Sequence, residues 1–428
     1  MNEHFLQYLW KNKLIKNQKI RTHQGSPIRI LDFGIQNNDA GPDFMNSIIE
    51  MDGIKWAGNV EIHVKTSDWY KHDHHKDDAY KNIILHVVYE NDLKECDTAL
   101  SKYPVLEIKN LFDKKLFDRY RGFLLSKNWI PCQNDIGNIN EIIIISWLNR
   151  LLAERLERKS AEIIHYYNFF DNDWLETLYF FLCRNFGFKK NSVSFEMLAK
   201  SLPYKILSKH RDQIIQLEAL LFGQAGLLKP SFSEAYPKKL YHEYAFLRKK
   251  YNLNPINNSL WKFSKLRPPN FPTIRLVQLA QVIHASDNLW SLLINKHNPG
   301  VIKNILTVTA SDYWNNHYVF EKKSEGKPKK IGDTCIENIL INTVAPVMFV
   351  YGKHANNHVL CEKAFDLLSE LKPEKNSIIN NWEKTGIKPS NAADSQALIE
   401  LKKNYCTSKK CLECAIGSAL LKENNILN

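Results

Sequence analysis

Apolar and ionisable residues alternate along residues 55–65, which is the pattern of a half-buried β-strand. Because alternate side chains of a strand share a face, Glu61, His63 and Lys65 are expected to point to one side and the apolar residues between them to the other. Asp52-Gly53, just before this segment, is a strong signal for a two-residue hairpin turn. The segment is therefore predicted to be the return strand of a hairpin with one ionisable face.

Similar patterns predict the other elements of the first third of the chain. Apolar residues at helical spacing predict a helix over residues 3–13, and Ser67-Asp68 is typical of the start of a helix or turn. The remaining strand candidates are residues 28–33, 44–51, 83–89 and 105–108. Strands, then a helix, then further strands indicate an α/β domain that extends to roughly residue 130.

The pattern changes after Pro131-Cys132. Apolar residues with charges between them predict a long amphipathic helix over residues 141–167. Further helices are predicted over residues 173–186, 211–228, 238–251, 273–295 and 335–350, and we expect no strands among them. The sequence thus predicts two domains, an α/β domain over residues 1–132 and a mainly α-helical domain over residues 133–428.

Composition narrows the class of protein. A chain of 428 residues is long enough for two or three domains, and no apolar run approaches the ~20 residues that a membrane span needs. Residues 1–10 have the pattern of an amphipathic helix, not of a secretory signal. Because a protein without such a signal is expected in a reducing compartment, its eight cysteines are expected to be thiols or metal ligands and not disulfides. The net charge of +12 suits an anionic partner. We therefore expect a cytoplasmic protein that binds nucleic acid and no membrane.

The strongest candidate chemistry lies in the carboxylates of the predicted hairpin. Asp43 follows Gly41-Pro42 at the start of one strand, and Glu61 lies on the return strand. Phosphodiester hydrolysis with Mg²⁺ or Mn²⁺ requires two or three converging carboxylates and a basic group near the attacking water. Asp43 and Glu61 are therefore the predicted metal ligands, and His63 or Lys65 is the predicted group that orients the water.

This pattern resembles the PD-(D/E)XK nuclease superfamily, which has the restriction-endonuclease-like fold. Pro42-Asp43 corresponds to the first half of its motif and Glu61-Ile62-His63 to the second. The resemblance implies a Mg²⁺-dependent nuclease acting on DNA, with Glu3 as the acid of the first helix and Asp77 or Tyr80 as a polar residue that faces the site. His63 stands where the superfamily usually has lysine. Either His63 replaces that lysine, or Lys65 reaches back, or the site has lost catalysis.

Longer phrases resemble a second family over nearly the whole chain. They include residues 39–44 (DAGPDF), 56–63 (WAGNVEIH), 267–272 (RPPNFP) and 411–417 (CLECAIG). These phrases are similar to those of an uncharacterised bacterial family, domain of unknown function 2851. Since that family has no established activity, the resemblance supports the division into domains more than the chemistry.

A histidine-rich segment follows the predicted return strand. His72, His74 and His75 are interleaved with aspartates, and closely spaced histidines with a nearby aspartate occur in zinc hydrolases. An alternative function is therefore a metal-dependent hydrolase of small phosphoesters, in which His72, His74 and His86 converge. The pattern itself favours positions at the surface or behind the ligands for His74 and His75, and a hydrogen-bonded core position for His86.

Three cysteines near the C-terminus, Cys406, Cys411 and Cys414, form a C-x₄-C-x₂-C pattern. Thiolates at this spacing favour Zn²⁺ or an iron–sulfur cluster, because a short turn brings them into one coordination sphere. A fourth ligand must come from elsewhere, from Cys132, Cys335, Cys361 or a histidine. Cys132, at the predicted domain junction, is the expected one. The alternative is a set of reduced thiols on a polar loop.

Arg267 and Arg275 flank a proline-rich segment before a predicted helix. They are candidates for binding phosphates beside the N-terminus of that helix, or for pairing with acids in a rigid connector. The sequence as a whole predicts a metal-dependent nuclease that cleaves DNA. A non-catalytic nucleic-acid-binding protein on the same fold and the histidine-based phosphoesterase are the alternatives.

Overall fold

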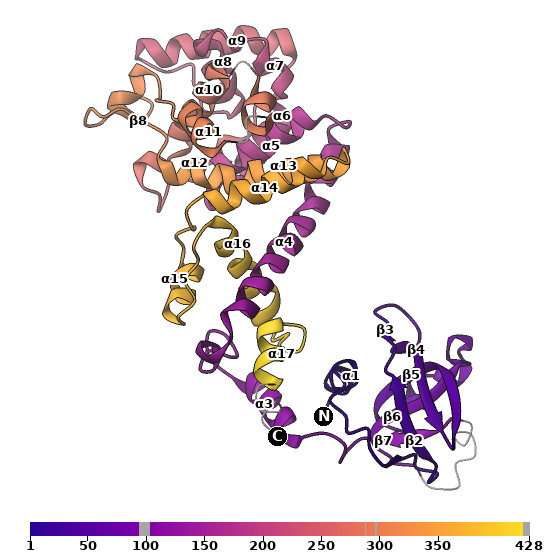
Figure 1. Cartoon of the computed structure of the whole chain (residues 1–428). Coiled ribbons are helices and arrows are strands. Elements are labelled where there is room, and N and C mark those ends of the chain that lie inside the picture. Colours follow the sequence, from indigo (N-terminus) through magenta and orange to yellow (C-terminus); the bar gives the residue numbers. More distant parts are fainter. Residues whose placement is uncertain (94–102, 287, 296–297, 423–428) are drawn as a thin grey trace. The chain divides into compact units, whose positions relative to one another are not determined.

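The computed structural model describes residues 1–93, 103–286, 288–295 and 298–422 (Figure 1). The chain divides into two compact units, of which the first comprises residues 1–143 and 404–428 and the second comprises residues 144–403. The first unit contains a β-sheet with helices, and the second is mainly helical, as the hydrophobic pattern predicted. A domain boundary at residue 132 stays a prediction.

The first unit is built on one mixed sheet, which has seven strands within the described residues and the order β1-β2-β4-β5-β6-β7, with β3 paired to β4. The strands are β1 Ile20–Arg21, β2 Pro27–Asp32, β3 Ile35–Gln36, β4 Phe44–Met51, β5 Ile54–Lys65, β6 Ile83–Glu90 and β7 Val105–Glu107. β2, β4 and β5 form an antiparallel meander, whereas β6 is parallel to β5 and β7 is parallel to β6. β5 is therefore a central strand with one neighbour of each kind.

The predicted hairpin is confirmed. Asp52 and Gly53 both have positive φ angles, 50° and 78°, and connect Met51 to its partner Ile54 as a two-residue turn. Because β5 is central, its apolar and its ionisable face are both covered, and Glu61 and His63 are buried. The expectation of a half-exposed strand holds only for the two ends of β5.

Helices cover the sheet and extend the first unit. They are α1 Glu3–Lys11, α2 Asp68–Lys71, the 3₁₀ turns η1 His74–Lys76, η2 Asp78–Tyr80 and η3 Ile136–Asn138, and the helices α3 Lys114–Leu125 and α17 Ala415–Lys422. α1 packs its apolar face against the sheet, and Trp10 Nε1 donates to the carbonyl of Phe33 at 2.8 Å. Tyr8 Oη lies 3.0 Å from Ser418 Oγ, so α17 is held against α1 although it is distant in sequence.

The second unit is a helical assembly with long buried helices. Its helices are α4 Glu141–Phe169, α5 Trp174–Phe186, α6 Phe188–Ser201, α7 Tyr204–Ser208, α8 Ile214–Gln224, α9 Ala235–Tyr251, α10 Pro272–Ala285, α11 Pro299–Leu306, α12 Asp333–Ile339, α13 Ala345–His354, α14 His358–Glu370, α15 Ser377–Lys384 and α16 Ala392–Glu400. A two-stranded hairpin, β8 His317–Val319 with β9 Lys322–Lys323, was not expected. The predicted helix over residues 273–295 is too long, because α10 ends at Ala285 where Ser286 becomes extended.

One helical stretch, Asp333–His354, is long and apolar enough to cross a membrane by length and composition. Within the second unit, 78% of its most apolar window is buried. Burial on nearly all sides accounts for a helix that is apolar all round, as in the core of a large domain.

Arg275 corrects one expectation from the sequence. Its side chain is buried, donates to Gln278 Oε1 at 2.9 Å and to Asn270 Oδ1 at 2.6 Å, and stacks on the ring of Phe188. It is therefore committed to internal contacts and does not present its charge to a phosphate. Arg267 is exposed, so the two arginines do not form a phosphate-binding pair.

Candidate metal centre of the first unit

Two carboxylates, of which Glu61 is buried and Asp43 half-buried, meet where β4 begins beside β5. The backbone N–H of Asp43 donates to Glu61 Oε2 at 3.1 Å, and the N–H of Ile62 donates to Asp43 Oδ2 at 3.0 Å. Gln7, on α1, donates to Asp43 Oδ1 at 2.8 Å. These bonds fix both carboxylates and leave Oε1 of Glu61 facing away from the backbone.

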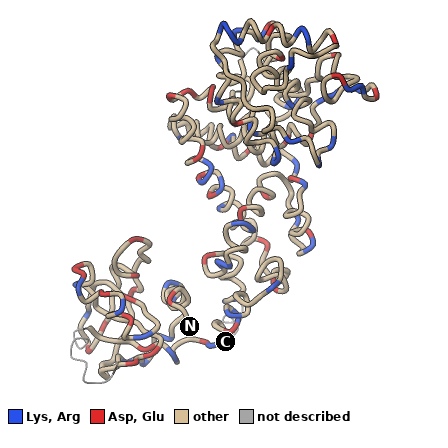
Figure 2. The backbone as a smooth tube through the Cα atoms, turned by 180° about the vertical axis from the view of Figure 1, so that it is seen from behind, with Lys and Arg blue, Asp and Glu red and all other residues tan. Residues whose placement is uncertain are grey.

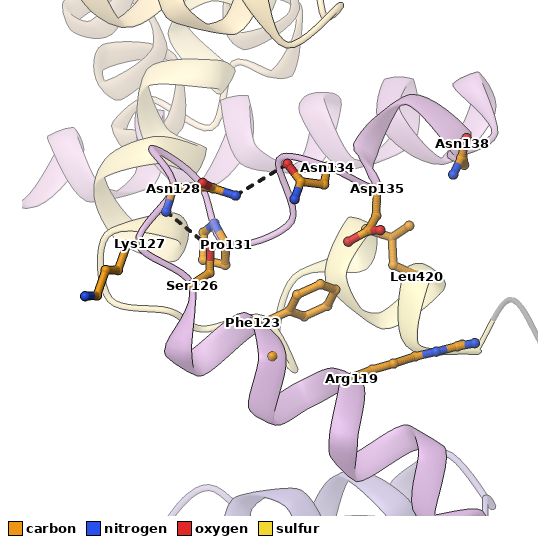
Figure 3. Close-up of a pocket in the computed structure, with 11 residues that line it drawn as sticks. Arg119, Phe123, Ser126, Lys127, Asn128, Pro131, Asn134, Asp135, Asn138 and Leu420 are labelled. Atoms are coloured by element: carbon orange, nitrogen blue, oxygen red, sulfur yellow. Dashed lines mark hydrogen bonds between the residues drawn. The ribbon is translucent and has the colours of Figure 1, made fainter.

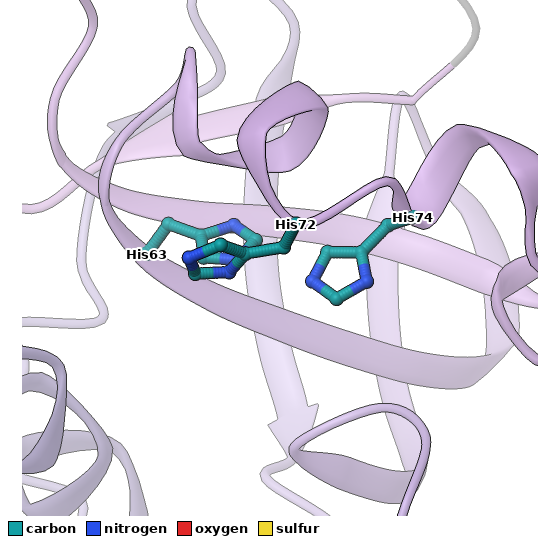
Figure 4. Close-up of side chains that lie close together, drawn as sticks. All are labelled: His63, His72 and His74. Atoms are coloured by element: carbon teal, nitrogen blue, oxygen red, sulfur yellow. The ribbon is translucent and has the colours of Figure 1, made fainter.

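Three histidines, His63, His72 and His74, lie close together beside this pair (Figure 4). Glu61 Oε1 lies 3.2 Å from His74 Nε2 and 3.6 Å from His63 Nε2. His63 Nε2 in turn lies 3.2 Å from His72 Nδ1. Each histidine thus offers one ligand atom, and these atoms lie within 4.8 Å of one another.

The contacts between successive members of this group are about as short as those between ligands of one metal ion. A tetrahedral zinc ion with bonds of ~2.0–2.1 Å holds its ligand atoms about 3.3 Å apart. The three contacts that link His72, His63, Glu61 and His74 measure 3.2, 3.6 and 3.2 Å. The three imidazole nitrogens, which lie within 4.8 Å of one another, form a candidate metal centre, and we call these histidines together with the adjacent Glu61 the His–Glu centre.

The segment after β5 bends back to deliver the second and third histidines. α2 ends at Lys71, and Asp73 takes the left-handed conformation, with φ 60°, that turns the chain into η1. The ring of His74 stacks on Tyr80 with 4.0 Å between centroids, and Tyr80 packs in turn against Trp69. Aromatic packing under the segment thus fixes His74 over Glu61.

His86, on β6, supports the centre from the interior. Its Nε2 lies 2.8 Å from His63 Nδ1, and the residue is completely buried. This confirms the predicted hydrogen-bonded core position. His74, which was expected at the surface or behind the ligands, lies 3.2 Å from Glu61, and whether it is a ligand stays a prediction. His75 is exposed, as expected, and its ring is tilted at 57° to that of Tyr70.

Burial sets the protonation of the centre. It raises the pKa of Glu61 to about 9, with further contributions from the charges of Asp43 and Glu3, and it raises the pKa of Asp43 to about 6. Burial and the neighbouring histidines lower the pKa of His63 to about 2 and that of His86 to about 3. Without a metal, a protonated Glu61 thus faces neutral imidazoles that have lone pairs available.

The other predicted site residues lie around this centre at different depths. Glu3, on α1, is half-buried, and its charge raises the pKa of both Asp43 and Glu61. Asp77 is exposed and caps η2 by accepting the N–H of Ala79 at 2.9 Å. Lys65 is exposed at the end of β5, and its backbone N–H donates to Asp68. The structure brings Glu3, Asp43, Glu61 and His63 together.

A separate pocket of about 590 Å³ lies at the other end of the first unit (Figure 3). α3, the following loop and α17 line it, with Arg119, Phe123, Ser126, Lys127, Asn128, Pro131, Asn134, Asp135, Asn138 and Leu420 among its residues. None of the residues of the His–Glu centre lines this pocket. It borders the loop that carries Cys132.

The sheet and the His–Glu centre define an α/β unit with a candidate metal site, joined to a helical unit. A family model described as "Protein of unknown function (DUF2851)" matches residues 3–377, and the chain belongs to that family. No curated protein and no solved structure matches the chain. The phrase at residues 411–417 lies outside the matched residues.

Proposed function

We propose that the first unit is a metal-dependent hydrolase that cleaves phosphodiester bonds in nucleic acid. Its metal ion would be held by Glu61, His63, His72 and His74. The observation that carries this proposal is that the imidazole ligand atoms of His63, His72 and His74 lie within 4.8 Å of one another, with Glu61 Oε1 3.2 Å from His74 Nε2 and 3.6 Å from His63 Nε2. Bound there, the ion would activate water and polarise the phosphoryl group.

The choice of ligands favours a transition metal over Mg²⁺. Mg²⁺ prefers oxygen ligands and keeps several waters, whereas imidazole nitrogens suit Zn²⁺ and related ions. Asp43 and Glu3 add oxygen donors close to Glu61, as their effects on its pKa indicate. We therefore propose Zn²⁺ or Mn²⁺ at the His–Glu centre in place of the expected Mg²⁺.

The positions of the acids support phosphodiester chemistry on a restriction-endonuclease-like arrangement. Asp43 directly precedes β4, Glu61 lies on the paired strand β5, and Glu3 lies on the first helix. His63 replaces the usual lysine, and because it is buried and neutral we assign it the role of a ligand instead of a charge. His72 is exposed, so substrate would approach from that side.

The substrate assignment rests on charge. The chain carries a net charge of +12, which favours a polyanion, and DNA is the proposed substrate. The second candidate, hydrolysis of small phosphoesters, is favoured by the participation of His72 and His74 in the centre. Substrate size is what separates the two functions.

A cleavage assay tests the proposal. Metal-free full-length protein would be supplied with Zn²⁺, Mn²⁺ or Mg²⁺ and offered single- and double-stranded DNA, RNA, a nitrophenyl phosphodiester and a nitrophenyl phosphomonoester. We expect diester cleavage with Zn²⁺ or Mn²⁺ that falls by about 100-fold or more in Glu61→Gln and His74→Ala.

The matched control is His75→Ala, because His75 neighbours His74 in sequence but is exposed outside the centre. It should retain the wild-type rate. Equal cleavage by wild type and Glu61→Gln would point to a contaminant and overturn the assignment. Cleavage of the monoester alone would replace the nuclease by the small-phosphoester enzyme, and metal binding without any cleavage would favour the non-catalytic alternative.

A further inference from the structure

Four cysteines of the first unit come from two segments that are distant in sequence. Cys406, Cys411 and Cys414 lie in the chain that leads into α17, and Cys132 lies in the loop after α3. Cys132, Cys411 and Cys414 are each only 7% exposed, and Cys406 is half-buried.

The cysteine-rich turn is anchored to the loop that carries Cys132. Lys409, between the first two cysteines, takes the left-handed conformation with φ 52°, and its Nζ donates to the carbonyl of Ser126 at 3.1 Å and to that of Leu124. A Cβ at Gly417 would lie 2.3 Å from the carbonyl oxygen of Cys411. The start of α17 therefore needs glycine to pack directly on this turn.

Cys132 lies within electrostatic range of the other thiols. Burial, followed by the neighbouring Cys414 and Cys411, raises the pKa of Cys132 to about 12. Burial and Cys414 likewise raise the pKa of Cys411 to about 12. The carbonyl of Cys132 accepts the N–H groups of Asp135 and Ile136, both at 3.0 Å, which holds the loop in a tight turn at this residue. Two anchored turns thus place three thiols in one buried region.

We propose that Cys132, Cys411 and Cys414, with Cys406 from the same turn, bind a thiophilic metal as zinc or as an iron–sulfur cluster. A site closed by four thiolates has no open position, so its role would be structural. The metal would tie the C-terminal segment to the α3 loop. Among the described residues, only the histidine trio has its ligand atoms within 4.8 Å of one another. The sulfurs are therefore spaced more widely, and binding would draw them together.

Metal analysis of full-length protein purified without oxygen tests this site. We expect about one equivalent of thiolate-bound zinc, or iron with sulfide and visible absorbance, per chain. Cys132→Ser and Cys411→Ser should each remove it, and Cys361→Ser, on α14, is the matched control that should retain it. His74→Ala should leave this metal in place. The experiment therefore tests the cysteine site independently of the His–Glu centre.

X-ray absorption on the wild-type protein gives a result that does not depend on the folding of any variant. Sulfur atoms in the coordination shell of the bound metal would support the site and distinguish a single zinc ion from an iron–sulfur cluster. Wild-type protein that folds without such a metal, even after incubation with zinc or after iron–sulfur reconstitution, would overturn the proposal. Serine variants with wild-type metal content would overturn it equally.

Discussion

Glu61 is the residue on which the candidate centre depends most, because its two carboxylate oxygens have different partners. Oε2 accepts the N–H of Asp43, whereas Oε1 faces His74 and His63. The pKa of Glu61 is about 9 and that of His63 is about 2, so at neutral pH the metal-free carboxyl is protonated and the imidazole is not. A metal ion must therefore displace a proton from the carboxyl group and none from His63.

Metal affinity should consequently rise with pH through an unusually high range. We predict an increase of about tenfold per pH unit from neutral pH up to about 9, because only deprotonated Glu61 is a ligand. Titration calorimetry with Mn²⁺ in buffers of different ionisation enthalpy would measure the affinity and the released proton. Glu61→Gln should bind weakly with little pH dependence. An affinity that levels off above the ordinary histidine pKa would contradict this ordering of protonation.

The raised pKa of Glu61 also makes the free energy of unfolding depend on pH. The unfolded chain releases the Glu61 proton near 4.5 and the folded chain releases it near 9. Between those values the folded state binds more protons, so this residue's contribution to the free energy of unfolding falls as pH rises. Without metal, the protein should therefore lose this contribution between pH 4.5 and about 9.

His86 is predicted to act as a positioning residue. For His63 to offer Nε2 to a metal, its Nδ1 must carry the proton and donate to His86 Nε2. His86→Ala should lower metal affinity by about 10- to 100-fold, and His86→Gln, whose carbonyl can accept that proton, should restore most of it. Competition with a fluorescent chelator would measure this, with His75→Ala as the control. Wild-type affinity in a folded His86→Ala protein would contradict the role.

At the scale of elements, local patterns predicted the strands that carry the carboxylates. Residues 44–51 were predicted as a strand and form β4 with those bounds, and Asp52-Gly53 forms the expected turn, because alternation and turn chemistry are encoded within a few residues. The placement of His74 was not predictable in this way. It depends on the left-handed Asp73 and on stacking against Tyr80, and neither leaves a periodic signal.

Two predictions for the second unit were wrong because the hydrophobic pattern of the sequence is ambiguous there. The apolar residues Leu292–Ile294 continue the helical pattern beyond α10, although they belong to a separate π-helical turn. Arg275 has the sequence character of a polar surface residue, but it is buried and its two Nη atoms donate to Gln278, Cys335 and Asn270. The periodicity of a sequence shows which side chains are apolar, but it does not show which polar side chains form hydrogen bonds in the interior.

Gly58 is predicted to be required where β5 approaches the start of β6. A Cβ there would lie 2.4 Å from Ile84 Cγ2 and 2.7 Å from the carbonyl oxygen of Asn82. Gly58→Ala should therefore lower the free energy of unfolding by about 1–3 kcal/mol, measured by urea denaturation. Gly122→Ala, at an exposed position of α3 with open space around it, should be neutral or stabilising. Equal stability of the two variants would contradict the close strand contact.

At the scale of the whole molecule, each unit has its own core and its own charge pattern. In the second unit, buried Glu400 pairs with Arg158 at 2.8 Å and with Arg155 at 3.5 Å, so these two arginines form ion pairs within the unit. Lys and Arg positions are distributed along the backbone of both units (Figure 2). The net charge of +12 is the basis of the proposed binding of a polyanion.

Nucleic-acid affinity should depend steeply on salt if this charge serves binding. Each phosphate neutralised by lysine or arginine releases counterions, so the logarithm of the affinity should fall linearly with the logarithm of salt concentration. Fluorescence anisotropy with a labelled DNA duplex, using Glu61→Gln to prevent cleavage, would measure the slope. Absence of binding at low salt would leave the net charge without a role in recognition.

The central claim is that one metal ion binds between Glu61 and three histidines, and anomalous diffraction tests it most directly. Crystals grown with Zn²⁺ would be measured on both sides of the zinc absorption edge. We predict an anomalous peak within ~2.0–2.2 Å of Glu61 Oε1, His63 Nε2, His72 Nδ1 and His74 Nε2. A map with no peak there, in crystals whose anomalous signal is otherwise clear, would contradict the account.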